Sequence, residues 1–372
     1  MRVILFFTYG ISLIKWKESG LLDREIKFYQ KLNEKYNVNF TFITYGDSQD
    51  MEIIDLPYIK VVPVYKNIKE DTSKFLKFLR SLFIPFVFSS VLKEGDIFKT
   101  NQLLGSWVAI VSKILYRKPL IIRTGYDLVT FTKKNNKGFL KIVSYSILTR
   151  LSLFFSNLYL VTSNVDKNYI SRLSKFNSSK VKTRPNWIER QEIKNFIKRF
   201  DMKLISVGRL ENQKNYHLLL EGIKGYDIEL DIYGEGSLKY KLQEYALKNS
   251  LKVTIHKPIS NKELVKTFSN YKIFVSTSDF EGNPKAILEA MSCGCVVVAK
   301  ENENINEIIT DGKNGLLFNS KEDMVKKINR VINDADYWNV ISNNAYESVI
   351  RTNLIDNIVD HEYKDYEKLN FP

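Results

Sequence analysis

The chain has few of the residues that build metal centres and disulfide frameworks. Among its 372 residues are two cysteines and three histidines. Cys293 and Cys295 lie two positions apart in an apolar run, so they can form neither a disulfide framework nor a four-ligand zinc site. His217, His256 and His361 occupy dissimilar contexts, which favours structural or surface roles over catalysis. We therefore expect no metal, no cofactor and a reducing compartment.

Long hydrophobic runs are also missing. The run at residues 81–92 is too short to span a bilayer and contains Pro85. The apolar start of the chain resembles a signal sequence, but it lacks a small-residue cleavage site and continues into a charged helical pattern. We interpret this start as a buried first strand, and the sequence predicts no transmembrane helix.

Negative charge is scarce in the first half only. Residues 1–186 hold 30 Lys and Arg against 14 Asp and Glu (+16), whereas the remainder holds 26 against 28 (−2). Such an asymmetry favours an anionic partner for the first half, such as a membrane surface, a lipid diphosphate, an acidic glycan or nucleic acid. A genome biased towards Lys, Asn and Ile is the alternative explanation, although it should affect both halves.

Short β-branched runs alternate with amphipathic helical patterns along the whole chain, which predicts parallel sheets covered on both faces. The pattern breaks at residues 184–187 and then restarts, so we predict two doubly wound α/β domains, 1–186 and 187–372, the last with terminal helices at about 346–372. Strands are predicted at residues 3–8, 39–44, 60–64, 96–100, 120–124, 158–162, 181–184, 204–207, 229–233, 252–256, 273–276 and 296–299.

Two loops that follow predicted strands carry the chemistry. The first contains Gly208, Arg209 and Lys214, a glycine that permits close approach of a ligand and two cations that suit a diphosphate. A solvated basic turn is the alternative interpretation of this loop alone. The second contains Glu281 and leads into a helix with Glu289, so two carboxylates can grip hydroxyls of one elongated ligand.

The start of that helix is a candidate anion site. Pro284 suits the first helical turn, and Asn283 or an earlier residue is expected to cap the helix. The free backbone N–H groups of such a terminus attract negative charge.

Together these motifs resemble the retaining GT-B glycosyltransferases of family 4, also called group 1 glycosyltransferases. The resemblance rests on the Gly208 loop, on EGNPKAILEAMSCGCVVVA at 281–299, and on the run at 306–316. It implies a GT-B fold, in which two Rossmann-like domains face each other across a cleft, an N-terminal domain for the acceptor and a C-terminal domain for the nucleotide sugar. Terminal helices would pack back toward the N-terminal domain.

The resemblance also implies roles for individual residues. Arg209 and Lys214 would neutralise the donor diphosphate and stabilise the leaving group without a metal, and Glu281 would contact the transferred sugar. Glu289 would bind the ribose hydroxyls. The remaining donor-binding candidates are Gly208, Gly234, Glu235, Gly282, Asn283, Pro284 and Lys285.

The first half departs from the family pattern. Tyr126 stands where many relatives have a histidine, and Asp127 beside it stays a catalytic candidate. The Gly-Gly loop after the first strand is absent, so Gly10, Ser12 and Gly20 are its nearest substitutes. Together with Tyr126 they are the acceptor-binding candidates.

The function predicted is transfer of a sugar from a UDP- or GDP-sugar to a lipid-linked or polysaccharide acceptor in cell-surface glycan synthesis. The enzyme is expected to be cytoplasmic and peripheral at the inner face of the membrane, without binding nucleic acid. Mixed aromatic and basic segments at 74–92 and 133–160 suit an anionic bilayer, or else are core helices with solvated charged faces. Alternative functions are a sugar-nucleotide epimerase of the same fold and a non-catalytic basic protein that binds membrane or nucleic acid.

Overall fold

The computed structural model describes residues 1–135, 138–191 and 199–370. The chain divides into two compact units: unit 1 comprises residues 1–184 and 358–372, and unit 2 comprises residues 185–357. The first boundary lies between Arg184 and Pro185, inside the predicted break at 184–187. Most of the polar stretch expected to follow that break, residues 192–198, lies outside the described residues.

Unit 1 is built on a parallel sheet of seven strands in the order β3-β2-β1-β4-β5-β6-β7. The first strand pairs with β2 on one side and with β4 on the other, so the chain winds outward in both directions from β1. The strands are β1 (Arg2–Phe6), β2 (Asn39–Thr44), β3 (Ile59–Pro63), β4 (Ile97–Thr100), β5 (Leu120–Arg123), β6 (Leu158–Val161) and β7 (Val181–Thr183). The start of the chain is thus a buried strand, as predicted.

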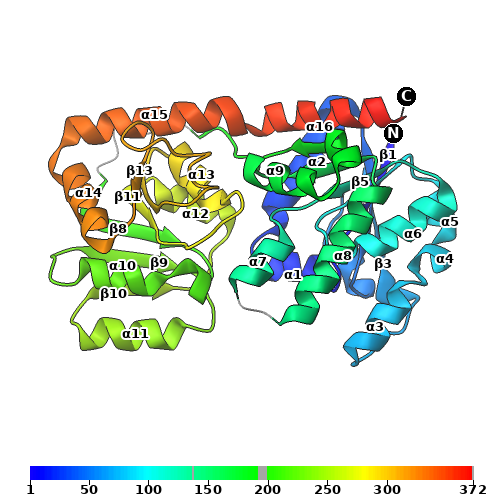
Figure 1. Cartoon of the computed structure of the whole chain (residues 1–372), viewed down its shortest axis with the longest axis horizontal. Coiled ribbons are helices and arrows are strands. Elements are labelled where there is room, and N and C mark those ends of the chain that lie inside the picture. The colour runs from blue at the N-terminus through cyan, green and yellow to red at the C-terminus, as the bar shows by residue number, and fades with distance from the viewer. Residues whose placement is uncertain (136–137, 192–198, 371–372) are drawn as a thin grey trace. The chain divides into compact units, whose positions relative to one another are not determined.

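Helices cover both faces of this sheet (Figure 1). One face packs on α4, α5, α6, α8 and α9 through a continuous apolar core, and the other packs on α2, whose Tyr29 ring meets the rings of Phe40 and Phe42 on β2. The helices are α1 (Leu13–Glu18), α2 (Leu22–Tyr36), α3 (Lys74–Ser81), α4 (Ile84–Val87), α5 (Ser89–Lys93), α6 (Ser106–Tyr116), α7 (Leu128–Lys134), α8 (Phe139–Phe155), α9 (Asn164–Leu173) and α16 (Ile355–Asn370).

The C-terminal helix α16 is held to unit 1 by buried charge. Glu362 is fully buried and accepts a hydrogen bond from Lys99 Nζ of β4, while Arg184 pairs with Asp365. Burial alone would raise the pKa of Glu362, but the positive charges of Lys99, Arg184 and Arg123 hold it to about 2. The predicted return of the terminal helices to the N-terminal domain is confirmed for α16.

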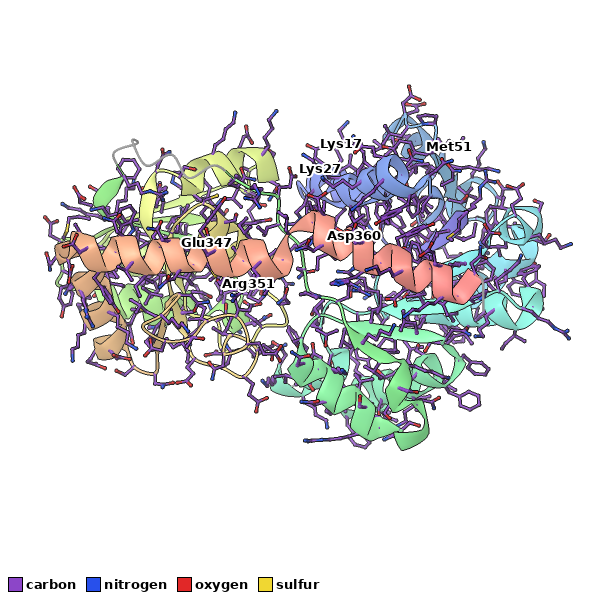
Figure 2. All side chains as sticks on the ribbon, turned by 90° about the horizontal axis from the view of Figure 1, so that it is seen from above. Lys17, Lys27, Met51, Glu347, Arg351 and Asp360 are labelled. Atoms are coloured by element: carbon purple, nitrogen blue, oxygen red, sulfur yellow. The ribbon has the colours of Figure 1, made fainter. Side chains whose placement is uncertain are left out.

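A second contact fixes the solvent side of the same helix. Asp360, labelled on α16 in Figure 2, accepts hydrogen bonds from Lys35 Nζ at 2.5 Å and Tyr36 Oη at 2.9 Å. The ring of Tyr36 stacks on that of Tyr363 with centroids 3.8 Å apart. From residue 358 onward, helix α16 therefore belongs to unit 1, although the preceding helix belongs to unit 2.

Unit 2 repeats the architecture with six parallel strands in the order β10-β9-β8-β11-β12-β13. The strands are β8 (Phe200–Val207), β9 (Glu229–Tyr233), β10 (Lys252–His256), β11 (Tyr271–Ser276), β12 (Val296–Lys300) and β13 (Leu316–Phe318). The predicted pair of doubly wound parallel sheets is confirmed. The three-residue β13 is an addition to the predicted strands, and β8 begins four residues earlier than expected.

Side chains alternate between the two faces of the unit 2 sheet, and each face packs in a separate apolar core. One core joins the sheet to α10 (Tyr216–Ile223), α11 (Lys239–Lys248) and α14 (Lys321–Asn333). The other joins it to α12 (Asn261–Phe268), α13 (Lys285–Ser292) and α15 (Ala335–Asn353). Within the described residues, no helix is both long and apolar enough to cross a membrane.

Candidate functional site

Three glycines allow the loops after β8 and β9 to pack backbone against backbone. A Cβ atom on Gly234 would lie 1.9 Å from the carbonyl oxygen of Gly208, and one on Gly236 would lie 2.5 Å from that of Leu210. The Leu210 N–H donates to the carbonyl of Glu235 at 2.8 Å. Only glycine permits so close an approach, so the predicted loops form one floor at the carboxyl ends of neighbouring strands.

The two predicted cations lie on this floor in different environments. Lys214 ends the 3₁₀ turn η4 (Asn212–Lys214), and its Nζ donates to Glu281 Oε1 at 2.5 Å, with the side chains only 18% and 10% exposed. Arg209 is exposed, and no residue in the described part of the chain forms an ion pair with it. One cation is thus held in place by a carboxylate, and the other is free to meet a ligand.

Hydrogen bonds join the Gly208 loop to the loop between β11 and α13. Gln213 Nε2 donates to the Phe280 carbonyl at 2.8 Å, and the Asp279 N–H donates to the Gln213 carbonyl at 3.0 Å. Thr277 Oγ1 donates to the Lys214 carbonyl at 2.9 Å. The structure therefore brings the two predicted motifs together. Nothing in the sequence predicted that Gln213 joins the two loops, because its partner lies 67 positions away.

The start of α13 differs from the sequence expectation. Pro284 occupies the N-cap position, and no side chain of the described residues caps the helix. The prediction that Asn283 or an earlier residue caps the helix is wrong. The Asn283 Oδ1 accepts instead from the Asn186 N–H at 2.8 Å, and Asn186 Nδ2 donates to the Asn283 carbonyl at 2.5 Å. The nearby Lys285 ammonium lies 5.6 Å from the Trp187 ring centroid. The helix terminus thus has no carboxylate or hydroxyl cap that would compete with an anion.

Glu289 lies further along the same helix and is 6% exposed. Its Oε1 accepts from Asn261 Nδ2, at the start of α12, at 2.9 Å. Gly282 is buried beside Glu281, whereas Glu235 is exposed on the neighbouring loop. Sequence reasoning missed Asn261, which stands in a polar turn without a distinguishing motif. The Asn261 amide therefore fixes the orientation of the Glu289 carboxylate.

The candidates of unit 1 near residue 127 have structural partners. Asp127 is 4% exposed and caps α7, where its Oδ2 accepts from the Thr130 N–H at 2.5 Å. Tyr126 is exposed, and its ring centroid lies 4.3 Å from that of Phe131. A cap explains Asp127 without catalysis, so its catalytic role stays a prediction.

The loop after β1 is occupied by a carboxylate that sequence reasoning missed. Ser12 caps the short helix α1, and the fully buried Asp50 accepts from the N–H groups of Leu13 and Ile14, each at 3.1 Å. Gly10 and Gly20 adopt positive φ angles of 75° and 67° at the two ends of this segment. Acceptor binding by Gly10, Ser12 and Gly20 stays a prediction.

No group of three or more His, Cys, Asp and Glu residues gathers in a metal-binding arrangement within residues 1–135, 138–191 and 199–370. Both cysteines are buried and free.

Comparison with known proteins shows a family likeness in unit 2. Residues 188–348 match the glycosyl transferases group 1 family. This segment is similar to a group 1 glycosyltransferase domain. It contains Gly208, Lys214, Glu281 and Glu289, so the loops described above lie inside the matched region.

Two curated relatives illustrate this similarity. An uncharacterised glycosyltransferase of Methanocaldococcus jannaschii is 29% identical over 144 residues, covering 38% of this chain and 41% of the relative. The poly(ribitol-phosphate) alpha-N-acetylglucosaminyltransferase of Staphylococcus aureus is 27% identical over 198 residues, covering 50% of this chain and 40% of the relative. The matched segments thus span about two fifths of the length of these relatives.

A solved structure is similar over the whole chain. The Anabaena protein HepE, in a crystal structure with UDP-glucose, has a TM-score of 0.76 and 16% identity, covering 99% of this chain and 100% of that one. This likeness shows the GT-B fold, which agrees with the predicted fold class.

Proposed function

We propose that the chain is a metal-independent, retaining glycosyltransferase that uses a UDP- or GDP-sugar as donor. One observation carries the proposal: hydrogen bonds and the Lys214–Glu281 pair unite the Gly208 loop and the loop before α13 into one site. The group 1 family match covers both loops.

The donor diphosphate would lie where positive charge is concentrated. Arg209 is exposed and unpaired within the described chain, Lys214 has two further N–H groups besides the one given to Glu281, and the start of α13 lacks a side-chain cap. Cations and helix N-termini bind phosphate oxygens strongly. Glu289 would accept hydrogen bonds from the ribose hydroxyls, since Asn261 holds its carboxylate in place.

Transfer would proceed by cleavage of the bond between the anomeric carbon and the phosphate oxygen, with the electron pair passing to the phosphate. Arg209 and Lys214 would stabilise the charge that gathers there in the transition state. The acceptor hydroxyl would attack from the same face, and its proton would pass to the leaving phosphate oxygen. Glu281 would contact the transferred sugar and keep Lys214 directed into the site. This charge stabilisation requires no metal ion.

The acceptor would be a lipid-linked saccharide or a polysaccharide of the cell surface, bound by unit 1 at the inner face of the membrane. Two observations support this part of the proposal: the excess of 16 positive charges in residues 1–186, and the polymeric acceptor in the name of the Staphylococcus aureus relative. An anionic or lipid-borne acceptor is attracted to such a basic surface.

Purified protein tests the proposal by a thermal-shift screen of sugar nucleotides. The preferred donor is then incubated with lipid-linked and oligosaccharide acceptors, and the products are analysed by mass spectrometry and by NMR of the new anomeric proton. A glycosylated product with the donor's anomeric configuration is expected. Donor conversion without any acceptor would indicate the epimerase instead, and no stabilisation by any sugar nucleotide would contradict the proposal.

A further inference from the structure

One flank of unit 1 collects the exposed apolar side chains of the molecule. Among the described residues, 23 large hydrophobic side chains are exposed. Six lie on α3 and α4, one between these two helices, two on α6 and six on α8, fifteen in all. These helices cover the same face of the sheet, where α4 and α8 both pack on α6 (Figure 1). Large contiguous apolar surfaces on proteins mark interaction sites.

Helix α8 shows the feature most clearly because its exposed side is apolar as well as its buried side. It packs on the core of unit 1 through Leu153, which is 1% exposed, and through the partly buried Leu148 and Phe155. Leu140 and Phe154, near its two ends, are nevertheless 81% and 64% exposed. A helix that packs on a core and faces water usually carries polar and charged side chains on its outer side.

The exposed apolar residues of α8 form one stripe. Phe139, Leu140, Val143, Ile147, Leu151 and Phe154 recur at helical spacing along its 17 residues. Residues at intervals of three and four lie on one side of a helix. The apolar stripe therefore runs from one end of α8 to the other, and the exposed Arg150 lies on the same side.

Positive charge exceeds negative charge around this surface. Residues 97–165 contain ten Lys and Arg but only one acidic residue, Asp127, which is buried as the cap of α7. On α3, by contrast, two cations pair with the acidic residues at 70 and 71, so the uncompensated positive charge lies mainly around α6 and α8. A surface of this composition attracts anionic lipid headgroups at about 1 kcal/mol for each cation close to the bilayer.

A basic pocket lies at the C-terminal end of the stripe. It is a shallow hollow of about 330 Å³ lined by Lys113, Arg117 and Lys118, together with Asn157 just after α8. Lys180 adjoins it, since its Nζ donates to the Phe154 carbonyl at 3.4 Å. Burial, and then the charge of Lys180, lower the pKa of Lys113.

The helix dipole explains only part of this cluster. Lys113 and Arg117 stand at the C-terminus of α6, where positive charge is favourable. Lys118 and Lys180 lie outside that helix, and none of the four cations forms an ion pair with a described carboxylate. An anion in the pocket would relieve their mutual repulsion.

We propose that this flank docks on an anionic phospholipid bilayer, with the α8 stripe inserted among the acyl chains and the pocket of Lys113, Arg117 and Lys118 receiving lipid phosphate. Aromatic and aliphatic side chains buried at the interface supply the binding free energy, and the cations select anionic headgroups. The proposal does not depend on the donor chemistry of unit 2.

Vesicle flotation without sugar nucleotide tests the docking surface. Wild-type protein is expected to bind vesicles of phosphatidylcholine with phosphatidylglycerol, and to bind pure phosphatidylcholine at least tenfold more weakly. The variant Leu140→Glu/Ile147→Glu should lose at least tenfold in affinity. Tyr240→Glu/Leu247→Glu on α11 is the matched control, because these side chains are 82% and 81% exposed, and it should bind like wild type.

A second pair of variants tests the charge. Lys118→Gln/Lys180→Gln should weaken binding to anionic vesicles about tenfold or more, with a smaller dependence on salt. Lys241→Gln/Lys248→Gln on α11 is the control for lost charge and should change little. Circular dichroism and nucleotide binding by unit 2 verify folding, so loss of donor binding remains distinguishable from loss of vesicle binding.

Three results would overturn the proposal. The first is equal binding to neutral and anionic vesicles, and the second is unchanged vesicle binding by the α8 variant. The third is concentration-dependent self-association in light scattering that the α8 substitutions abolish, because the stripe would then be covered by a second copy of the chain.

Discussion

Replacing Gly234 with alanine should damage the proposed donor site although the residue carries no chemical group. The new Cβ would lie 1.9 Å from the Gly208 carbonyl oxygen, whereas real Cβ contacts essentially never fall below 3.0 Å. The two loops must therefore separate by about 1 Å. The clashing atoms are a Cβ atom and a backbone carbonyl oxygen, so no rotamer change can relieve the clash.

The expected cost is about 3 kcal/mol, at the upper end of values for overpacked sites. For a unit of this size, such a loss lowers the melting temperature by about 6–12 °C. Separation of the loops also displaces the Gly208 turn, and a displacement of about 1 Å weakens ligand positioning by as much as a hundredfold.

Differential scanning calorimetry and titration with UDP or GDP measure the two effects. Gly225→Ala is the control from the same unit, because its Cβ would meet no atom within 4 Å and only its positive φ of 84° is unfavourable. It should cost about 1–2 kcal/mol and leave nucleotide affinity unchanged. Wild-type melting and wild-type nucleotide affinity in Gly234→Ala would refute the packing argument.

Further predictions concern the carboxylates and thiols. Glu281→Gln should lower kcat about 10²–10³-fold in steady-state assays while nucleotide affinity changes only a few-fold, because the charge that directs Lys214 acts mainly in the transition state; a kcat near wild type would exclude this role. Glu289→Ala should weaken nucleotide binding about tenfold in calorimetric titration with kcat nearly unchanged, and an unaltered affinity would remove it from the ribose site. The pKa of Glu362 is held to about 2 in the folded state, below the ordinary value of 4.5, so its stabilisation is complete above about pH 4.5 and is lost as pH falls toward 2. Denaturant titrations should show about 3 kcal/mol lost over this range, and a flat profile would contradict the buried pair. Burial raises the pKa of both thiols, that of Cys295 to about 12, so iodoacetamide at pH 8 should label Cys293 and Cys295 only after unfolding. Mass spectrometry measures the labelling, and a labelled cysteine in the native protein would contradict this prediction.

The two sheets could be predicted from the sequence because each strand is a compact run of buried residues followed by a helical pattern. Strands β2 and β9 have the predicted bounds. The strand β13 was missed because three residues are too few to show a period. The buried hydrogen bond from Lys99 to Glu362 of α16 could not be predicted either. The two residues are 263 positions apart in the sequence, and neither lies in a distinguishing local pattern.

The site was predictable to a different degree in each unit. In unit 2, glycine, cation and carboxylate follow strand ends in a recognisable order, so Gly208, Lys214 and Glu281 could be predicted as candidates, and the structure joins their loops. The need for glycine at position 234 emerged only from its distance to a neighbouring loop. In unit 1, Asp127 and Asp50 are polar residues that stabilise helix ends, and a sequence does not distinguish such a carboxylate from a catalytic one.

The central claim is that Arg209 and Lys214 bind the diphosphate of a nucleotide sugar, and calorimetric titration with UDP and GDP tests it most directly. Wild-type protein should bind one of the two, and Arg209→Ala/Lys214→Ala should bind it at least about a hundredfold more weakly, since two charge-assisted hydrogen-bond donors are lost. Lys252→Ala, which removes an exposed lysine paired with Asp227, should bind like wild type. Undiminished nucleotide affinity in the double variant would contradict the claim.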